Sequence, residues 1–176
     1  MGLRPIYLTK TIRILIMKNR FIDIISLCGF SAFCLFISAI GGAVTLTSVN
    51  SWYQDLIKPS FTPPDWVFSP VWITLYLLMG ISAWLVWRQT DHKSKQLPLS
   101  VFGVQLALNL AWSFIFFGAR LVGWALIEIS FLWVAIVINI YLFWRINNLA
   151  GWLLIPYILW VTFAAILNSS IYVLNL

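Results

Sequence analysis

The chain has 176 residues, of which 62% are hydrophobic and only 9% are charged. A composition this apolar is typical of a protein of the lipid bilayer and excludes an ordinary water-soluble domain. The net charge of +6 does not indicate nucleic-acid binding, because the basic residues flank the apolar segments and form no single patch.

Five apolar segments are long enough to cross a bilayer as helices, which takes about 20 residues each. They run from Ile24 to about Val49, Trp66 to Trp87, Leu97 to Ala119, Leu121 to Trp144 and Gly151 to about Tyr172. Only Glu128 places a charged side chain within one of them. We therefore predict an all-α integral membrane protein, with a five-transmembrane-helix bundle over residues 24–176 and a basic N-terminal extension over residues 1–23.

The basic extension leaves two questions open. Met17 is followed by Lys18, Asn19 and Arg20, so either Met1 or Met17 is a candidate start. The apolar side chains between residues 6 and 16 would alternatively let this segment lie on the membrane surface. The apolar segment that follows is too long for the core of a signal peptide, so we expect the first span to be retained.

The basic residues are divided unequally between the two sides of the predicted bundle. Nine lie in the N-terminal extension and in the loops after spans two and four, whereas the other side holds only Lys58 and Arg120. The positive-inside rule then predicts a cytoplasmic N-terminus and a C-terminus outside. With no organelle-targeting presequence in view, this pattern favours a bacterial cytoplasmic membrane.

Residues 58–72, KPSFTPPDWVFSPVW, place four prolines between the first two spans. The Pro63-Pro64 pair predicts a loop that ends where the second span begins, with Asp65 at the positive end of that helix. Pro70, one turn further in, is expected to kink or loosen the helix. The connection over residues 50–65 is longer than two neighbouring helices need, and we interpret it as a lid over the outward end of the bundle.

Metal and cofactor chemistry is not expected. Cys28 and Cys34 lie roughly 240° apart around one helix and cannot form a disulfide. His92 is the single histidine, and the sequence contains no His and Cys cluster of the kind that holds zinc or haem.

Three spans align polar and aromatic residues on one helical face. These residues are Trp72, Tyr76, Gly80, Ala83 and Trp87 in span two, Gln105, Asn109, Trp112 and Phe116 in span three, and Trp124, Glu128, Phe131 and Ala135 in span four. Amides and carboxylates are costly in lipid, so we predict that these faces look into the bundle.

Several of these residues allow a purely structural interpretation. Gln105 and Asn109 could hold helices together without contacting a ligand. Glu128 could be a structural acid, a partner of Arg120 or, less favoured, part of a proton relay. The tryptophans near span ends are typical of an interfacial belt, namely Trp52, Trp84, Trp144 and Trp152.

Small residues occupy the opposite face of span three, about 160° from Gln105. Gly103, Ala107 and Ala111 repeat every four residues and would allow a second helix to approach closely. The neighbour could belong to the same chain or to a second subunit, and we favour a homodimer.

Three long motifs resemble the TspO/MBR family, the tryptophan-rich sensory proteins related to the mitochondrial translocator protein. They are WYQDLIKPSFTPPDWVFSPVWITLYLLMG, QLALNLAWSFIFFGARLVGWAL and PYILWVTFAAILN. The resemblance runs from about Ile24 to Asn168. The motifs are long and rich in tryptophan, so chance similarity is not a sufficient explanation.

The resemblance implies a five-helix bundle with an outward pocket, covered by the first loop, for porphyrins such as protoporphyrin IX, sterols and benzodiazepine-type drugs. The pocket positions of the family fall here on Tyr53, Pro63, Trp72, Tyr76, Asn109, Trp112, Trp124, Trp160, Ala164 and Asn168. Homodimerisation through span three is also a family property. Our own candidates for contacts with porphyrin carboxylates are Lys58 and Arg120.

A binding protein that acts as a sensor or regulator is the leading interpretation. A porphyrin-degrading enzyme driven by light and oxygen stays an alternative, with Trp72, Trp112 and Trp124 as photochemical candidates, because the sequence shows no conventional catalytic group. A porphyrin or sterol transporter is less favoured, since five unpaired spans do not form inverted repeats. The sterol motif of animal relatives is not matched, because the chain ends LNSSIYVLNL without a basic residue.

Overall fold

A computed structural model describes the backbone of residues 4–89 and 92–176 and the side chains of residues 20–89 and 95–176. The described elements are all helical: α1 (Arg4–Val49), α2 (Trp52–Asp55), a 3-10 turn (Asp65–Val67), α3 (Phe68–Gln89), α4 (His92–Ser113) continued by a π-helical turn (Phe114–Gly118), α5 (Val122–Trp144), α6 (Asn148–Leu153) and α7 (Ile155–Leu174).

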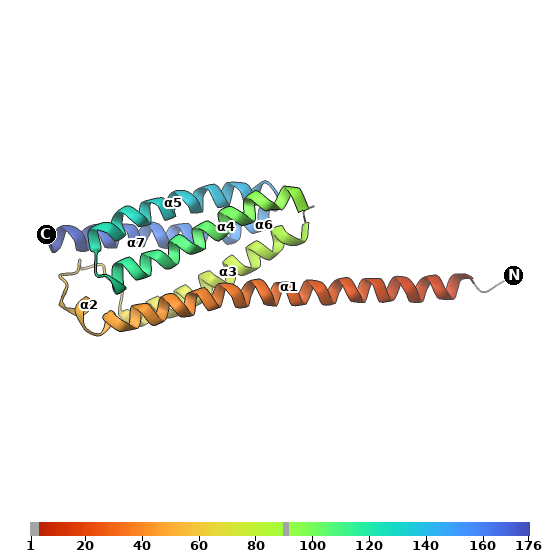
Figure 1. The fold of residues 1–176 in the computed structure, drawn as a ribbon, viewed down its shortest axis with the longest axis horizontal. Helices are drawn as coiled ribbons and strands as arrows, with labels where there is room; N and C mark the ends of the chain where they lie inside the picture. The colour runs from red at the N-terminus through yellow and green to blue at the C-terminus, as the bar shows by residue number, and fades with distance from the viewer. Residues whose placement is uncertain (1–3, 90–91) are drawn as a thin grey trace.

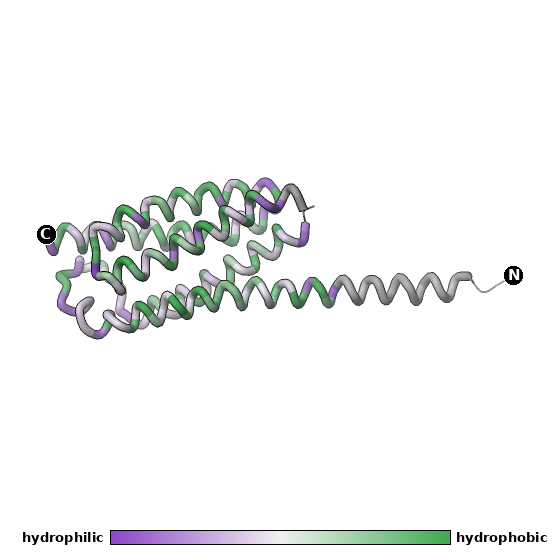
Figure 2. The backbone as a smooth tube through the Cα atoms, viewed as in Figure 1, coloured by the Kyte–Doolittle hydropathy of each residue, from purple (hydrophilic) through white to green (hydrophobic). Residues whose placement is uncertain are grey.

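Five helices in the described part of the chain are long and apolar enough to span a bilayer. They cover Arg20–Val49, Asp65–Gln89, Lys95–Gly118, Val122–Trp144 and Asn148–Leu174. Figure 1 shows them lying side by side as one bundle, and Figure 2 shows hydrophobic residues along most of their length. The predicted all-α, five-helix membrane architecture is confirmed.

Helix α1 is much longer than its neighbours. Its 46 residues correspond to roughly 70 Å at 1.5 Å per residue, about twice the hydrocarbon thickness of a bilayer. The helix passes residue 23 without a break and projects beyond the rest of the bundle (Figure 1). The choice between Met1 and Met17 as the start, and the side chains of residues 6–16, lie outside the described residues.

The bundle has two chemically different ends. We call the end that holds residues 50–65 and the C-terminus the loop end (Figure 1). The opposite end, where α3 is followed by α4 and α5 by α6, is the basic end, with Arg88 and Arg145 on the surface.

Close contact between α1 and α3 depends on Gly80. A Cβ atom at this position would lie 2.8 Å from the Cα atom of Ser31 on α1, so any larger residue would push the two helices apart. The contact also sets the register of the two antiparallel helices, because each residue further along α3 meets a residue earlier on α1.

The prolines between α1 and α3 act at the start of α3. Pro64 caps the 3-10 turn that begins at Asp65, as predicted. Pro70 lies in the first turn of α3, where its missing N–H removes no hydrogen bond within that helix. The connection expected as loop contains one short helix, α2.

Candidate functional site

Three buried polar side chains form a network in the middle of the bundle. The Tyr76 hydroxyl on α3 donates to Asn109 Oδ1 on α4 at 2.6 Å, and Asn109 Nδ2 donates to the Tyr157 hydroxyl on α7 at 2.8 Å. The three residues are 3%, 4% and 0% exposed. A single amide therefore joins three helices by using both its donor and its acceptor.

Aromatic rings border this network. The Trp72 ring centre lies 5.8 Å from that of Tyr76 and 6.4 Å from that of Tyr157. Trp160, one turn beyond Tyr157 on α7, packs edge-on against Phe68 with 5.9 Å between ring centres. The network is thus bounded by large π-surfaces from α3 and α7.

A second polar pair lies nearer the loop end. Trp112 Nε1 donates to Asn168 Oδ1 at 3.2 Å, and Asn168 Nδ2 donates to the Val122 carbonyl at 3.0 Å. The Trp112 ring stacks on Phe116 with 5.0 Å between centres. The inward faces predicted for spans two and three are confirmed here, since Tyr76, Asn109 and Phe116 are all buried.

The connection between α1 and α3 is fastened over the loop end. Tyr53 is 4% exposed, and its ring lies 5.6 Å from that of Phe117. The Asn175 side chain, just after α7, accepts the Ile57 N–H at 3.0 Å and donates to the Ile57 carbonyl at 2.9 Å. The Phe61 ring packs edge-on against Phe163 of α7. One amide therefore pairs with both backbone groups of a loop residue 118 positions away in the sequence.

Two cations lie over aromatic rings at the loop end. Lys58 Nζ is 4.5 Å from the ring centre of Tyr53, and the Arg120 guanidinium is 6.0 Å from that of Trp52. Within the described part of the chain, neither forms an ion pair with a carboxylate. The phenol of Tyr53 has its pKa raised to about 12 by burial and, secondarily, by the negative charge of Asp65.

The inward face predicted for span four is wrong for its two aromatic residues, although Glu128 and Ala135 on the same face are half-buried. Trp124 and Phe131 are 66% and 65% exposed, so both point away from the bundle. Helix α5 instead buries the face that begins one residue later, at Ala125, Ile129 and Leu132. A helix that is apolar all round offers little contrast from which its buried face can be chosen.

Glu128 lies at the edge of this buried face. Both carboxylate oxygens are covered, and among the described residues they have no hydrogen-bond partner. Glu128 forms no ion pair with Arg120, which was one of the interpretations open from the sequence.

The other predicted site residues are distributed around the network. Pro63 is half-buried in the connection between α1 and α3, and Ala164 is half-buried on α7. Sequence reasoning missed Tyr157 and Asn175. Tyr157 could have been found, because it shares a helical face with Ala164 and Asn168, seven and eleven residues later. Asn175 could not have been found from the sequence, since its side chain bonds to a backbone group in a distant loop.

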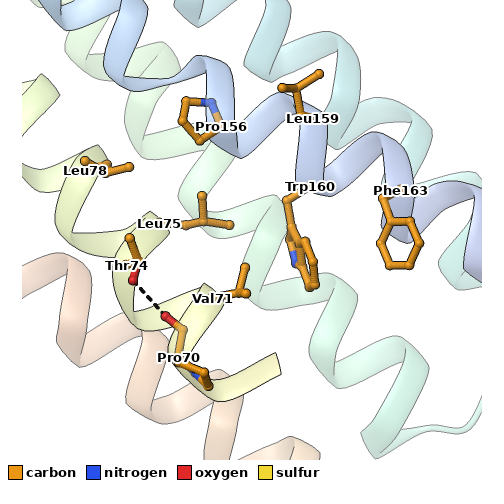
Figure 3. A pocket seen from close by; sticks show the side chains of 9 residues that line it. All are labelled: Pro70, Val71, Thr74, Leu75, Leu78, Pro156, Leu159, Trp160 and Phe163. Carbon is orange, nitrogen blue, oxygen red and sulfur yellow. Dashed lines mark hydrogen bonds between the residues drawn. The ribbon is translucent and has the colours of Figure 1, made fainter. Parts of the chain in front are cut away.

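A groove of about 600 Å³ separates α3 from α7 (Figure 3). Trp160 is the predicted ligand residue that lines it. The whole lining is Pro70, Val71, Thr74, Leu75, Leu78, Pro156, Leu159, Trp160 and Phe163. The Thr74 hydroxyl donates to the Pro70 carbonyl at 2.8 Å, so the groove wall is apolar in character.

Helix α6 accounts for the position of the groove. The Ser82 hydroxyl on α3 donates to the Ala150 carbonyl on α6 at 2.7 Å, so α6 packs against the basic half of α3. The chain then breaks at Leu154 before α7 begins. Nearer the loop end α3 therefore lacks the neighbour that α6 provides, and the groove lies there.

Other candidate sites are limited. No group of three or more metal-ligating side chains occurs among the residues that the structure describes. On α4, Gly103 is exposed, and a Cβ atom added there would meet nothing within 4 Å. Ala107 is also exposed, so part of the small-residue face lies on the outside of the single chain.

Comparison with known proteins gives a consistent result. The model of the TspO/MBR family matches residues 30–174. The chain is 38% identical over 159 residues to the tryptophan-rich protein TspO of Chlorobaculum tepidum, an alignment that covers 89% of this chain and 99% of the relative. It is 36% identical over 151 residues to protein CrtK of Rhodobacter capsulatus, covering 85% and 94%. It is 42% identical over 123 residues to the human translocator protein, covering 69% and 73%.

Proposed function

The chain belongs to the TspO/MBR family and is a multi-pass integral membrane protein, and from this premise we propose that its bundle binds flat lipophilic molecules. Tetrapyrroles such as protoporphyrin IX are the first candidates, and sterols and benzodiazepine-type drugs are further ones. The protein then acts as a sensor or regulator. The observation that carries this proposal is the network of Tyr76, Asn109 and Tyr157, bordered by Trp72 beneath a fastened loop.

The network suits ligand binding because its bonds join side chains to side chains. Asn109 presents one donor and one acceptor to two phenols. A ligand N–H can replace Tyr76 as the donor to Asn109, and a ligand carbonyl can replace Tyr157 as its acceptor, without breaking a backbone bond of any helix. The residues are fully buried, so a ligand that reaches Asn109 must separate these side chains and compete for their bonds.

The surrounding rings suit a planar ligand. Trp72 and Trp160 present large aromatic surfaces from α3 and α7, against which a macrocycle can stack or pack edge-on. The groove beside Trp160 has a volume within the range of roughly 300–1,000 Å³ typical of small-molecule sites. We propose that a ligand can also enter the interior from the bilayer through this groove, in addition to the path that the loop closes.

The two cations of the loop end complete the proposed site. A porphyrin with two carboxylates would gain charge-assisted hydrogen bonds from Lys58 and Arg120. Both side chains already lie over aromatic rings that border the connection, and neither is committed to a carboxylate among the described residues.

We further propose the orientation and assembly of the protein. The basic end faces the cytoplasm and the loop end faces outward, as the positive-inside rule predicts, in a bacterial cytoplasmic membrane. Two copies pair through the small-residue face of α4, which is Gly103, Ala107 and Ala111. The exposure of Gly103 and Ala107 in the single chain supports this pairing.

The direct test is a titration of the purified protein in detergent with protoporphyrin IX in the dark, followed by tryptophan fluorescence. Saturable quenching at micromolar ligand is expected, and Trp72→Phe should reduce the quenching amplitude. Trp152→Phe is the matched control, because Trp152 lies at the basic end and is 58% exposed. Quenching that never saturates would contradict the proposal.

The packing of the Trp72 ring against the rings of Tyr76 and Tyr157 favours a second candidate function, light-driven porphyrin degradation. These rings could supply electrons to an excited macrocycle in the presence of oxygen. Illumination of the same titrated sample separates the two functions. A Soret band that stays stable under illumination supports binding alone. A Soret band that is lost in the parent protein but stays stable in Trp72→Phe supports the enzyme.

A further inference from the structure

A small pocket lies at the basic end, away from the network described above. It encloses about 220 Å³ between α1 and α3. Its lining combines charged, aromatic and aliphatic side chains, namely Arg20, Asp23, Ile24, Leu27, Trp84 and Arg88. Nothing in the proposed tetrapyrrole site uses these residues.

The pocket follows from the register between the two helices. Gly80 sits against Ser31, so Arg88, eight residues later on α3, meets Asp23, eight residues earlier on α1. Arg88 Nη2 and Asp23 Oδ2 are 3.1 Å apart. Trp84 lies one turn further into the bundle, and the Arg88 guanidinium covers its ring at 4.6 Å from the ring centre.

The pocket changes from charged to apolar with depth. Two arginines are exposed at the rim. Arg88 lies in the last turn of α3, and Arg20 lies at the beginning of the apolar part of α1. Ile24 is one turn deeper on α1 and 61% exposed, and Leu27 continues the same wall. A molecule with an ionic head and an apolar chain matches this gradient.

The charges of the pocket do not balance. Asp23 is paired with Arg88, whereas Arg20 has no ion pair with any described residue. Two guanidinium groups against one carboxylate leave one positive charge in excess. A phosphodiester carries one negative charge and is a strong acceptor for arginine.

Trp84, which lines the pocket, carries a donor without an acceptor among the described residues. The indole N–H of Trp84 is buried and has no hydrogen-bond partner in the described part of the chain. An unsatisfied N–H is costly at the edge of a bilayer. A small rotation of the indole towards the pocket on binding would let a lipid oxygen beside Arg88 accept this N–H.

We propose that this pocket binds one anionic phospholipid of the leaflet that contacts the basic end. The phosphodiester lies between Arg20 and Arg88, and one acyl chain follows Ile24 and Leu27 along α1. A lipid fits better than a free anion, because the apolar wall continues directly into the bilayer-facing surface of α1. Basic pockets between transmembrane helices at the cytoplasmic side bind such head groups in other proteins.

Binding is tested on the full-length protein in detergent by native mass spectrometry. The probe is dioleoyl phosphatidylglycerol, compared with dioleoyl phosphatidylcholine, which has the same chains but a neutral head group. We expect the first phosphatidylglycerol molecule to bind more tightly than phosphatidylcholine. Arg20→Gln should weaken it about fivefold, since a basic residue near the surface contributes about 1 kcal/mol.

Arg145→Gln is the matched control for Arg20→Gln. Arg145 lies at the same end of the bundle and over a ring, that of Tyr141, but outside the pocket. Its loss should leave the first lipid unaffected. An equal loss from both variants would mean diffuse surface charge and would overturn the proposal.

Two further results sharpen the test. Trp84→Phe keeps an aromatic ring beneath Arg88 but removes the pyrrole ring together with its N–H, so it should weaken phosphatidylglycerol binding, and the melting temperature in detergent checks that the fold is retained. Inorganic phosphate at millimolar concentration should not displace the lipid, and displacement would assign the pocket to a free anion. Protoporphyrin affinity should not change in Arg20→Gln, so failure here and failure of the tetrapyrrole proposal are distinguishable.

Discussion

The central network differs in its bonding from two buried polar side chains of the basic half. In the middle of the bundle, Tyr76, Asn109 and Tyr157 bond to one another through their side chains. In the basic half, the Ser82 hydroxyl donates to the Ala150 carbonyl and Asn139 Nδ2 donates to the Pro98 carbonyl at 3.1 Å. These two donors bond to the backbone of another helix.

This difference separates framework from site. A bond to a backbone carbonyl fixes one helix against another, because the acceptor cannot move without its helix. A bond between two side chains can be exchanged, because a rotation of either one releases it. We therefore interpret the basic half as a rigid framework and the central network as the part that rearranges around a ligand.

The sharpest test of this comparison is Asn109→Leu. Removing the amide leaves the two phenols without their shared partner and removes the polar contact proposed for the ligand. Each buried bond of this kind is worth about 1–3 kcal/mol, so protoporphyrin affinity should fall about tenfold to a hundredfold. Fluorescence titration in the dark measures it. Unchanged affinity would remove the network from the proposed site.

Asn139→Leu should show the opposite behaviour. The substitution leaves the buried Pro98 carbonyl on α4 without the donor from α5, which should destabilise the protein by about 1–3 kcal/mol. A lowered melting temperature in detergent, with protoporphyrin affinity within about twofold of the parent, is the expected result. A large loss of affinity would erase the distinction between framework and site.

The connection at the loop end is expected to respond to Asn175→Ala. This change removes both bonds to Ile57 and also the bond from Asn175 Nδ2 to the Ile171 carbonyl near the end of α7. We expect bound protoporphyrin to dissociate several-fold faster, because about 1 kcal/mol per lost bond favours the open loop. Stopped-flow displacement measures the rate.

Ser170→Ala is the control for this loop variant, since its hydroxyl bonds only within α7, to the Ile166 carbonyl. Replacing Pro63 and Pro64 by alanine should accelerate release in the same direction by loosening the same connection. Dissociation that is unchanged both in Asn175→Ala and in the Pro63 and Pro64 replacement would show that the loop does not retain the ligand.

The smallest effect concerns pH. The pKa of Tyr53 is raised to about 12, against about 10 for a free tyrosine, so the folded loop keeps the proton that the open loop loses. The stabilisation is complete below about pH 10 and is lost as the pH rises towards 12. Protoporphyrin release should accelerate over this interval, and Tyr53→Phe should abolish that part of the dependence.

The inward faces of α3 and α4 could be predicted because each carries amide, phenol or glycine residues among aliphatic ones. Gln105 and Asn109 are 1% and 4% exposed, as their cost in lipid requires. The prediction is wrong for the aromatic residues of α5, since Trp124 lies on the outside. In a bilayer, an aromatic ring is equally stable facing lipid or a neighbouring helix, so it indicates neither face.

The amino-acid sequence alone determined the bilayer as solvent, the five spans and the start of α3 at its proline pair, because these depend on segment length, hydropathy and local backbone chemistry. Only the tertiary structure decided that Asn175 holds Ile57, that Tyr157 completes the network, and that Arg20, Trp84 and Arg88 line one pocket. These contacts depend on the register of antiparallel helices. A shift of one residue rotates a helical face by about 100°, which hydrophobicity cannot detect when lipid surrounds the bundle.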